Sequence, residues 1–242
     1  MGQSGAEIEH VVVDGGSTDG TVELLEAYED RYDLKWVSEP DDGQSDAINK
    51  GIEMATGDWI CWVNSDDYLL PGAMETLGGA AEGQPGADVI YGDYLFVDAE
   101  GNEVGRKYST PPSRFVHKHY YQFTGNHSMV IRRDTLDSLG GVDEELEYVM
   151  DADLLWRLLT ADLELVQVQS FIGARRLHEA AKTTGTPPPE RQAEMRELKS
   201  RYGLSPFERV VPDRALAAAA LGLQGTYHLL DGRPEALRYI RS

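Results

Sequence analysis

A short apolar run that ends at two adjacent carboxylates is the feature that most constrains this chain. Residues 59–63 (WICWV) have the length and the aromatic and β-branched composition of a buried strand. Asp66 and Asp67 follow at its carboxyl end, where open α/β sheets bind their ligands. Two neighbouring carboxylates repel each other unless positive charge lies near them, and a divalent cation is the usual partner. The pattern favours an α/β fold with a metal-dependent nucleotide site, because a cation on a diphosphate would meet both needs. A turn or a helix N-cap is the plainer interpretation of the same residues.

The rest of the chain alternates between the two kinds of secondary structure. We expect strands at residues 10–13 and 34–37 and helices at residues 22–32 and 46–55, with Ser45 capping the second helix. This order indicates an α/β protein with a mostly parallel sheet and helices on both faces. Further strands are expected at residues 88–93, 94–97 and 127–131, with a hairpin turn at residues 98–102. Further helices are expected at residues 133–139 and 151–159, and the second of them places Leu154, Leu155 and Leu158 on one face.

A proline-rich stretch near residue 185 separates two regions. The residues before it, 1–184, form one predicted domain, and residues 185–242 form a C-terminal helical extension with helices at 190–201 and 213–230. No apolar run reaches the roughly 18 residues that a membrane-spanning helix needs, so we expect no integral membrane segment. The net charge of −20 argues against nucleic acid as a partner. The single cysteine, Cys61, fits a cytoplasmic protein. Peripheral attachment to the inner face of the membrane and a homodimer are left open.

Six segments in order resemble the family 2 glycosyltransferases, an inverting group with a GT-A fold. The resemblance covers roughly residues 7–184 and rests on VVVDGGSTDGT, GQSDAINKGI, ATGDWICWVNSDDYLLPGA, HSMVIRRDTL, LGGVDEELEYVMDADLLWRL and RLHEAAKTT. It implies transfer of a sugar from a UDP-, GDP- or dTDP-sugar to a hydroxyl of a saccharide or lipid-linked acceptor, in polysaccharide or glycolipid synthesis. The Q-x-x-R-W element of processive members is absent from the sequence, which favours transfer of a single sugar.

The resemblance also implies roles for the acidic residues. Asp66 and Asp67 match the family's D-x-D element, which contacts the ribose and holds Mg²⁺ or Mn²⁺ on the diphosphate. Asp151 matches the general base, and its place at a helix N-terminus would keep its carboxylate charged. Asp153 is the competing acid, for which a capping or ion-pairing role is the alternative.

Other matched positions belong to the predicted donor pocket. Asp14 matches the family's aspartate at the end of a strand, in the nucleoside pocket, and Gln44 is expected on the donor side as well. Asp46 and Lys50 share a helix face that the family uses in this pocket, and an ordinary i,i+4 ion pair is the alternative. The segment that carries Arg176, His178 and Lys182 resembles the loop that closes over the diphosphate, where such side chains would contact phosphate. His127 could reach the acceptor, although a core position is the plainer interpretation.

Three departures from the family pattern bear on these expectations. The family has a further strand and helix ahead of the strand at residues 10–13, so we expect the chain to be truncated there. Asn64 replaces the first acid of the D-x-D element, and Gly15 replaces an acid that often recognises uracil. A non-catalytic nucleotide-sugar-binding remnant and a nucleotidyltransferase are the alternative functions, although Gly15-Gly16 lacks the basic residue that a nucleotidyltransferase loop needs.

Overall fold

The computed structural model describes residues 3, 5, 7–115, 123–178, 188–202, 219, 223 and 233. Its first elements are β1 (His10–Asp14), α1 (Thr21–Tyr28), the 3-10 helix η1 (Glu29–Arg31), β2 (Leu34–Ser38) and α2 (Gln44–Met54). The next are β3 (Trp59–Ile60), β4 (Tyr68–Leu69), α3 (Ala73–Gly83), β5 (Val89–Val97) and β6 (Glu103–Lys107). The last are η2 (Asn126–Ser128), β7 (Met129–Arg132), α5 (Arg133–Leu139), α6 (Met150–Thr160), β8 (Leu165–Arg176) and α7 (Pro189–Arg201).

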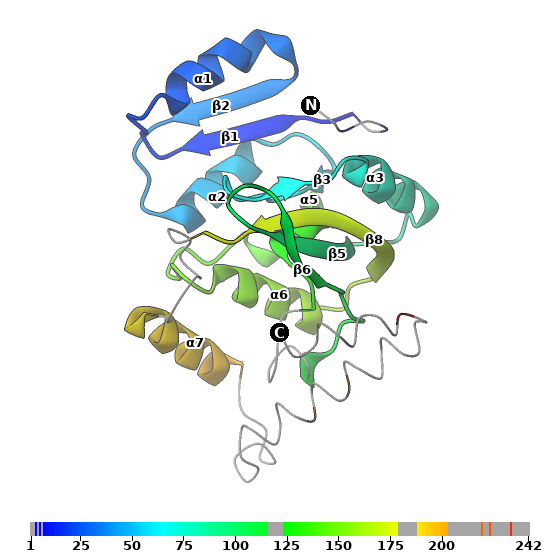
Figure 1. Cartoon of the computed structure of the whole chain (residues 1–242). Coiled ribbons are helices and arrows are strands. Elements are labelled where there is room, and N and C mark those ends of the chain that lie inside the picture. The colour runs from blue at the N-terminus through cyan, green and yellow to red at the C-terminus, as the bar shows by residue number, and fades with distance from the viewer. Residues whose placement is uncertain are drawn as a thin grey trace.

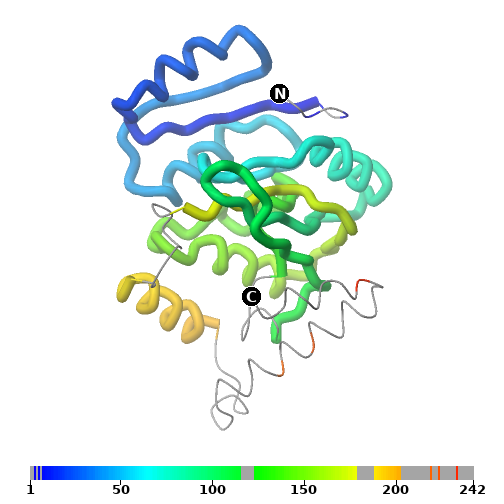
Figure 2. Tube along the Cα trace, in the orientation of Figure 1, coloured from blue at the N-terminus to red at the C-terminus, as the bar shows by residue number. Residues whose placement is uncertain are grey.

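Two sheets divide the strands. In the first, β1 and β2 pair in parallel, with His10 opposite Leu34 and Asp14 opposite Ser38. These strands and α1 lie along one side of the molecule, next to α2 (Figure 1). The second sheet has six strands in the order β3-β7-β5-β8-β4, and β6 pairs with the far half of β5. Figure 2 follows the chain through this arrangement, with residues near 170 running beside residues near 90.

The directions of the strands correct one sequence prediction. Only β5 and β8 pair in parallel within the larger sheet, whereas β3–β7, β5–β7, β5–β6 and β4–β8 are antiparallel, so that sheet is not mostly parallel. The strand–helix alternation of the first 60 residues predicts that β3 continues a parallel sheet with β1 and β2. In the structure β3 instead pairs with β7, in the second sheet. The turn at residues 98–102 forces β5 and β6 into a hairpin, as predicted, because the Asp98 side chain accepts the N–H of Asn102 at 2.8 Å.

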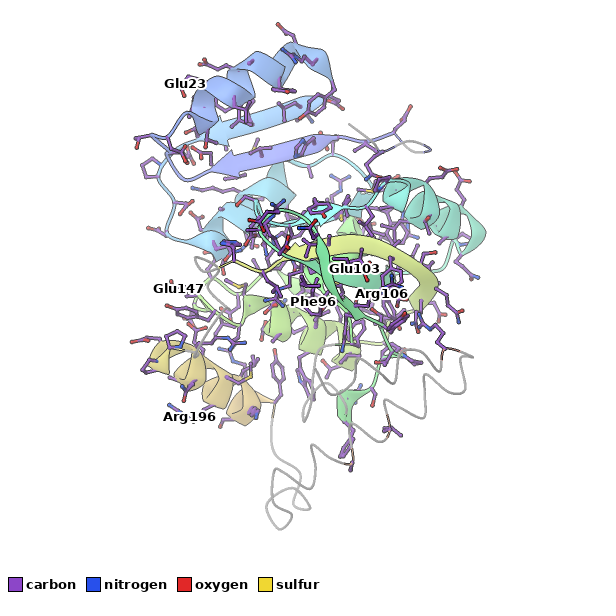
Figure 3. All side chains as sticks on the ribbon, in the orientation of Figure 1. Glu23, Phe96, Glu103, Arg106, Glu147 and Arg196 are labelled. Carbon is purple, nitrogen blue, oxygen red and sulfur yellow. The ribbon has the colours of Figure 1, made fainter. Side chains whose placement is uncertain are left out.

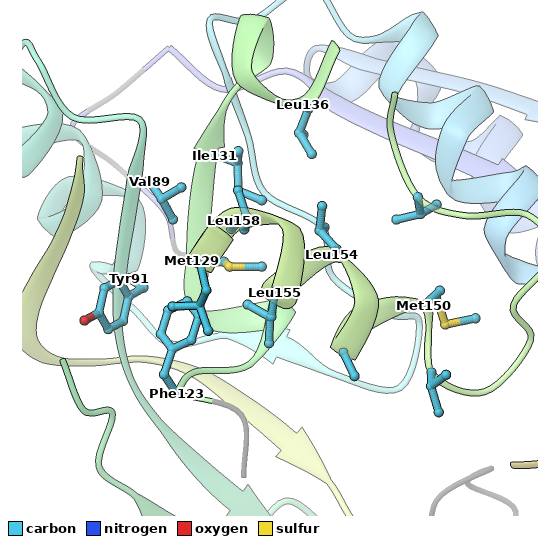
Figure 4. Packing of buried hydrophobic residues seen from close by; sticks show 14 of the residues in the cluster. Val89, Tyr91, Phe123, Met129, Ile131, Leu136, Met150, Leu154, Leu155 and Leu158 are labelled. Atoms are coloured by element: carbon cyan, nitrogen blue, oxygen red, sulfur yellow. The ribbon is translucent and has the colours of Figure 1, made fainter. Parts of the chain in front are cut away.

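The larger sheet is covered by helices on both faces, as the sequence predicts. Val89 and Tyr91 of β5 pack into a core with α5 and α6, whereas Ile90 between them packs into a core with α3. Figure 4 shows the first of these cores, where Leu154, Leu155 and Leu158 of α6 lie against the sheet. The apolar stripe that the sequence predicts on this helix is therefore the face that holds it in place.

Three strands, β4, β6 and β8, are not among those predicted from the sequence. The longest of them, β8, has the sequence LVQVQSFIGARR, in which polar residues interrupt the apolar ones without a regular alternation. The two-residue β4 follows the acidic pair directly and pairs with β8. This pairing matters for the site, because it brings the carboxyl end of β8 against the acidic loop. The predicted strand at residues 59–63 was too long, since β3 ends at Ile60.

The C-terminal extension is described only in part. Helix α7 confirms the predicted helix at residues 190–201, and Met195, Leu198 and Tyr202 pack into the core that α6 shares. Almost all of the predicted helix at residues 213–230, and the domain boundary at residue 184, lie outside the described residues. Among the residues that are described, none of the helices combines the length and the apolar character needed to cross a membrane.

Candidate active site

Asn64 is the centre of the acidic loop that follows β3. Its Oδ1 accepts hydrogen bonds from Gln44 Nε2 and Trp62 Nε1, both at 3.0 Å, and its Nδ2 lies 3.4 Å from Asp67 Oδ2. From the sequence, Asn64 is only a departure from the D-x-D element, and the spacing of the residues does not predict its hydrogen bonds with Gln44 and Trp62. A neutral amide both accepts from two donors and faces a carboxylate, which an aspartate could not do. Asn64 therefore fixes the shape of the loop.

The two acidic side chains point in different directions. Asp67 has a side chain that is only 4% exposed, and its Oδ1 accepts the backbone N–H of Arg176 at 3.0 Å. Burial raises the pKa of this carboxyl. Asp66 has a side chain that is 36% exposed, and its Oδ2 lies 3.1 Å from His178 Nε2. Only Asp66 is therefore placed to meet a ligand directly, whereas Asp67 ties the loop to β8.

Arg176 is engaged with the loop by its side chain as well. Its Nε donates to the carbonyl of Asp66 at 3.1 Å, and its guanidinium also donates to the carbonyl of Ala99 at 2.8 Å. The sequence predicts that the Arg176 side chain binds phosphate. In the structure its guanidinium instead holds the backbone of Asp66 and Ala99 together. Lys182, the other cation predicted here, lies outside the described residues. His178 is therefore the described member of this segment that faces Asp66 from a partly exposed position.

His127 lies under the acidic loop. It is 2% exposed, its ring meets Tyr94 edge-on, and its Nδ1 lies 3.4 Å from Asp67 Oδ2. Burial lowers the pKa of this imidazole to about 3, so the ring is neutral at physiological pH. Neither ring nitrogen has a hydrogen-bond partner within the described part of the chain. The core position that the sequence left open for His127 is the one observed.

Asp14 holds the turn after β1. Its Oδ2 accepts from the backbone N–H groups of Gly16 and Ser17, at 3.1 and 2.8 Å, and from Ser38 Oγ at 2.6 Å. Hydrogen bonds from Ser17, and then from Ser38, lower the pKa of Asp14 to about 2. The residue is therefore charged and 7% exposed, with one carboxylate oxygen committed to the glycine-rich turn.

Asp46 and Lys50 form the ion pair that the sequence gave as the alternative. Lys50 Nζ lies 3.1 Å from Asp46 Oδ2 and 3.1 Å from Glu39 Oε1. Asp46 Oδ2 also accepts the backbone N–H of Asp42 at 3.0 Å, which orders the loop before α2. Both residues thus shape the entrance of α2. The predicted cap by Ser45 was wrong, because its buried hydroxyl donates to the carbonyl of Leu146 at 2.8 Å instead.

Asp151 and Asp153 are separated by their surroundings. Asp153 is 1% exposed and receives hydrogen bonds from Arg157 Nε at 2.7 Å and from the Tyr202 hydroxyl at 2.5 Å. A carboxylate held in this way is occupied by structural partners. Asp151 lies in the first turn of α6 and is half-buried. Its carboxylate accepts a hydrogen bond from the adjacent backbone N–H of Ala152 at 2.7 Å. Of the two acids, Asp151 has the freer carboxylate.

The residues around Asp66 suit a cation that is shared with a substrate. Asp66 and His178 offer one carboxylate and one imidazole, and this mixture of oxygen and nitrogen ligands is compatible with Mn²⁺. Among the described residues, no three His, Cys, Asp or Glu side chains converge on one point. A protein that supplies one or two ligands leaves the remaining positions to water and substrate phosphates, which is how Mg²⁺ sites on diphosphates are commonly built.

Hydrogen bonds join five of the ten predicted residues into one region. Gln44, Asp66, Asp67, Arg176 and His178 all contact the acidic loop or each other, whereas the contacts of Asp14, Asp46 and Lys50 form separate groups on the β1 and α2 side. Ser45 links the start of α2 to Leu146, which precedes the helix of Asp151.

Comparisons with known proteins show the family and the fold of the chain. A family model described as glycosyl transferase family 2 matches residues 2–138, more than half of the chain. A PGL/p-HBAD biosynthesis glycosyltransferase of Mycobacterium bovis is 33% identical over 99 residues, which are 38% of this chain and 38% of that protein. The glycosyltransferase YibD of Escherichia coli K12 is 36% identical over 76 residues, 31% of this chain and 22% of that protein. The similarity thus spans well under half the length of these relatives.

Solved structures with a similar fold cover more of the chain. Staphylococcus aureus TarS 1-349, in complex with UDP-GlcNAc, gives a TM-score of 0.60 at 20% identity over 91% of this chain and 64% of that one. The mannosyltransferase PcManGT of Pyrobaculum calidifontis, in complex with GDP-Man and Mn²⁺, gives 0.53 at 14% identity over 96% of this chain and 75% of that one. At these identities the likeness shows the fold alone, and it confirms the predicted GT-A fold.

Proposed function

The chain belongs to glycosyl transferase family 2, and we propose that it transfers one sugar from a nucleotide-diphosphate donor to an acceptor hydroxyl with inversion at the anomeric carbon. The observation that carries the proposal is the acidic loop after β3, where Asp66 and His178 face each other across 3.1 Å at a partly exposed position. The fold neighbours TarS and PcManGT, whose structures hold UDP-GlcNAc and GDP-Man, support a nucleotide-sugar donor. The mycobacterial relative, a PGL/p-HBAD biosynthesis glycosyltransferase, supports the transfer of a sugar, and we propose a saccharide or lipid-linked acceptor.

In this proposal Asp66 and His178 hold Mg²⁺ or Mn²⁺ on the donor diphosphate. When bound, the cation neutralises the charge that develops on the leaving diphosphate. Asp67 is not a metal ligand in this proposal, although the sequence suggested that it would be one. Its buried carboxylate accepts the N–H of Arg176 and fixes the loop, so Asp66 is presented in one orientation. Gln44 acts on the same loop through Asn64.

Asp151 is the proposed general base. Its carboxylate lies in the first turn of α6 and can accept the proton of the attacking hydroxyl. Attack on the anomeric carbon from the face opposite the diphosphate then inverts its configuration. Asp153 is excluded from this part by its contacts with Arg157 and Tyr202.

The first experiment measures release of nucleoside diphosphate from UDP-GlcNAc, GDP-mannose and dTDP-glucose, with Mn²⁺ and with EDTA. Water serves as the acceptor when no other is supplied, and the anomer first formed is read by proton NMR. We expect one donor to be turned over with Mn²⁺ only and to give the inverted anomer. A well-folded chain that neither binds nor turns over any of these donors would contradict the proposal.

The variant Asp151→Asn separates catalysis from binding. Loss of the base is expected to lower kcat at least a hundredfold, since general-base catalysis contributes roughly 10²–10⁴-fold, while donor affinity measured by calorimetry stays within twofold. Asp162→Asn is the matched control, because it makes the same change at an exposed position just beyond the other end of α6. Equal activity of Asp151→Asn and the wild type would remove Asp151 from the mechanism.

A further inference from the structure

Helix α7 is fastened to the protein through a small apolar side. Met195, Leu198 and Tyr202 lie on one face of the helix and pack into the core of α6, and Leu198 is the one buried residue within α7. Figure 1 shows α7 beside the start of α6, on the side away from β1 and β2. Such a small apolar contact contributes little to fixing the position of α7. Its polar contacts are more informative.

Glu194 on α7 accepts hydrogen bonds from the backbone just before α6. Its Oε1 accepts the backbone N–H of Glu147 at 3.1 Å, and its Oε2 accepts the backbone N–H of Tyr148 at 2.8 Å. Figure 3 labels Glu147 at this entrance, close to α7. Both oxygens of one carboxylate are thus used on two successive backbone groups. Charge-assisted bonds of this kind are about twice as strong as neutral ones, and two of them fix both position and orientation.

The C-terminal end of α7 contacts α6 itself. The Tyr202 hydroxyl donates to Asp153 Oδ1 at 2.5 Å, and Arg201 lies between Asp143 and Asp153, with its NH1 3.7 Å from Asp153 Oδ1. Glu194 and Tyr202 are eight residues apart, which is roughly 12 Å along a helix. The middle of α7 and its C-terminal end therefore hold two separate points of the chain.

Asp151 lies between those two points. Tyr148 is three residues before it and Asp153 is two residues after it, and both are tied to α7. We propose that α7 positions the catalytic base, with Glu194 as the positioning residue that holds the segment leading to Asp151. This inference rests on the proposed function, and it assigns a task to a helix in which the sequence showed no catalytic signature. Glu194 acts through the backbone of residues 147–148 and does not touch the substrate.

The reason to expect a catalytic effect is geometric. A base must lie within hydrogen-bond reach of the proton it removes, and a displacement of about 1 Å can cost roughly a hundredfold in rate. Asp66 lies on the loop after β3 and His178 lies beyond the end of β8, and within the described part of the chain neither forms a hydrogen bond or ion pair with α7. Loosening the entrance of α6 should therefore slow turnover and leave donor binding intact.

The test compares Glu194→Ala, Glu194→Gln and the control Glu197→Gln. Glu197 lies on the same helix and loses the same charge, but its side chain is 67% exposed and its ion pair is with Arg201 at 3.6 Å. For Glu194→Ala we expect kcat with the active donor to fall roughly ten- to a hundredfold, with KM for the donor within twofold. Glu194→Gln keeps one accepting oxygen and should recover part of the loss, and Glu197→Gln should match the wild type.

Amide hydrogen exchange gives a readout that does not depend on turnover. The N–H groups of Glu147 and Tyr148 should exchange at least tenfold faster in Glu194→Ala and be unchanged in Glu197→Gln. Unchanged exchange, or an unchanged kcat in a wild-type background that turns over donor, would overturn the positioning role. A drop of kcat that also appears in full on top of Asp151→Asn would overturn it as well, because Glu194 must act through Asp151. Failure of the wild type to turn over any donor would instead contradict the proposed function.

Discussion

Asp14 provides the sharpest test of how the turn after β1 is held. The variant Asp14→Asn keeps the size of the side chain and removes the charge that Gly16, Ser17 and Ser38 stabilise through their hydrogen bonds. Those bonds lower the pKa of Asp14 from 3.8 to about 2 in the folded chain. A shift of nearly two units, at 1.36 kcal/mol per unit, corresponds to about 2 kcal/mol of folding free energy. Asp14 itself is 7% exposed, but exposed residues follow it at the end of a two-stranded sheet, so solvent screens its interactions and about 2 kcal/mol is an upper value.

The sign of the pH dependence follows from the direction of the shift. Because the folded pKa is lower than the unfolded one, the stabilisation is complete above the unfolded pKa near 3.8 and is lost as the pH falls through about 2. At pH 7 the wild type should therefore exceed Asp14→Asn by up to about 2 kcal/mol. By pH 3 roughly half of that difference should be gone.

Urea unfolding of both proteins at pH 7, 4 and 3 measures this difference directly. Asp19→Asn is the control, because Asp19 accepts hydrogen bonds from Thr21 at an exposed position of the same loop. A stability difference between wild type and Asp14→Asn that stays constant from pH 7 to pH 3 would refute the reasoning. If Asp14 also contacts the nucleoside, as the resemblance implies, the variant will weaken nucleotide binding at pH 7 in addition.

Three further predictions concern the metal, the C-terminal segment and the core. Asp66→Asn should abolish Mn²⁺-dependent binding of the donor in calorimetry while circular dichroism stays that of the wild type, and retained binding would move the cation elsewhere. Arg233→Met should cost about 3–5 kcal/mol in urea unfolding, because Arg233 NH1 lies 2.5 Å from the buried Asp93 carboxylate, and a loss under 1 kcal/mol would argue against that pair. Leu158→Ala should cost about 2–5 kcal/mol, since this side chain is 0% exposed in the core, and an unchanged unfolding midpoint would contradict its packing.

The fold was predictable where the pattern of the sequence is local. The strand at residues 10–13, the hairpin turn at residues 98–102 and the apolar stripe of Leu154, Leu155 and Leu158 each follow from residues that lie close together in the chain. Which strands pair does not follow from such patterns. The larger sheet places β7 between β3 and β5, and the two halves of β5 pair with different partners on one edge. Such long-range pairing depends on the whole core and not on any one segment.

The candidate site divides in the same way. The positions of Asp66 at the end of a strand region and of Asp151 in the first turn of a helix were predicted from sequence and are observed. The directions of the side chains were not. Nothing in the spacing distinguishes the exposed Asp66 from the buried Asp67, because their difference depends on Arg176, which lies more than a hundred residues away in the chain. Burial by a distant strand is invisible in a local motif.

The start of α2 explains how two distant parts of the site can be held in register. Gln44 and Ser45 are successive residues of one helix, so their side chains point about 100° apart. Gln44 reaches Asn64 in the acidic loop, and Ser45 reaches the carbonyl of Leu146, ahead of the helix that carries Asp151. Gly43, with a φ of 120°, supplies the backbone bend that a residue with a side chain would rarely adopt. One helical turn therefore contacts both the acidic loop and the segment before α6, which are the proposed donor side and the proposed base side, so a shift of α2 would act on both.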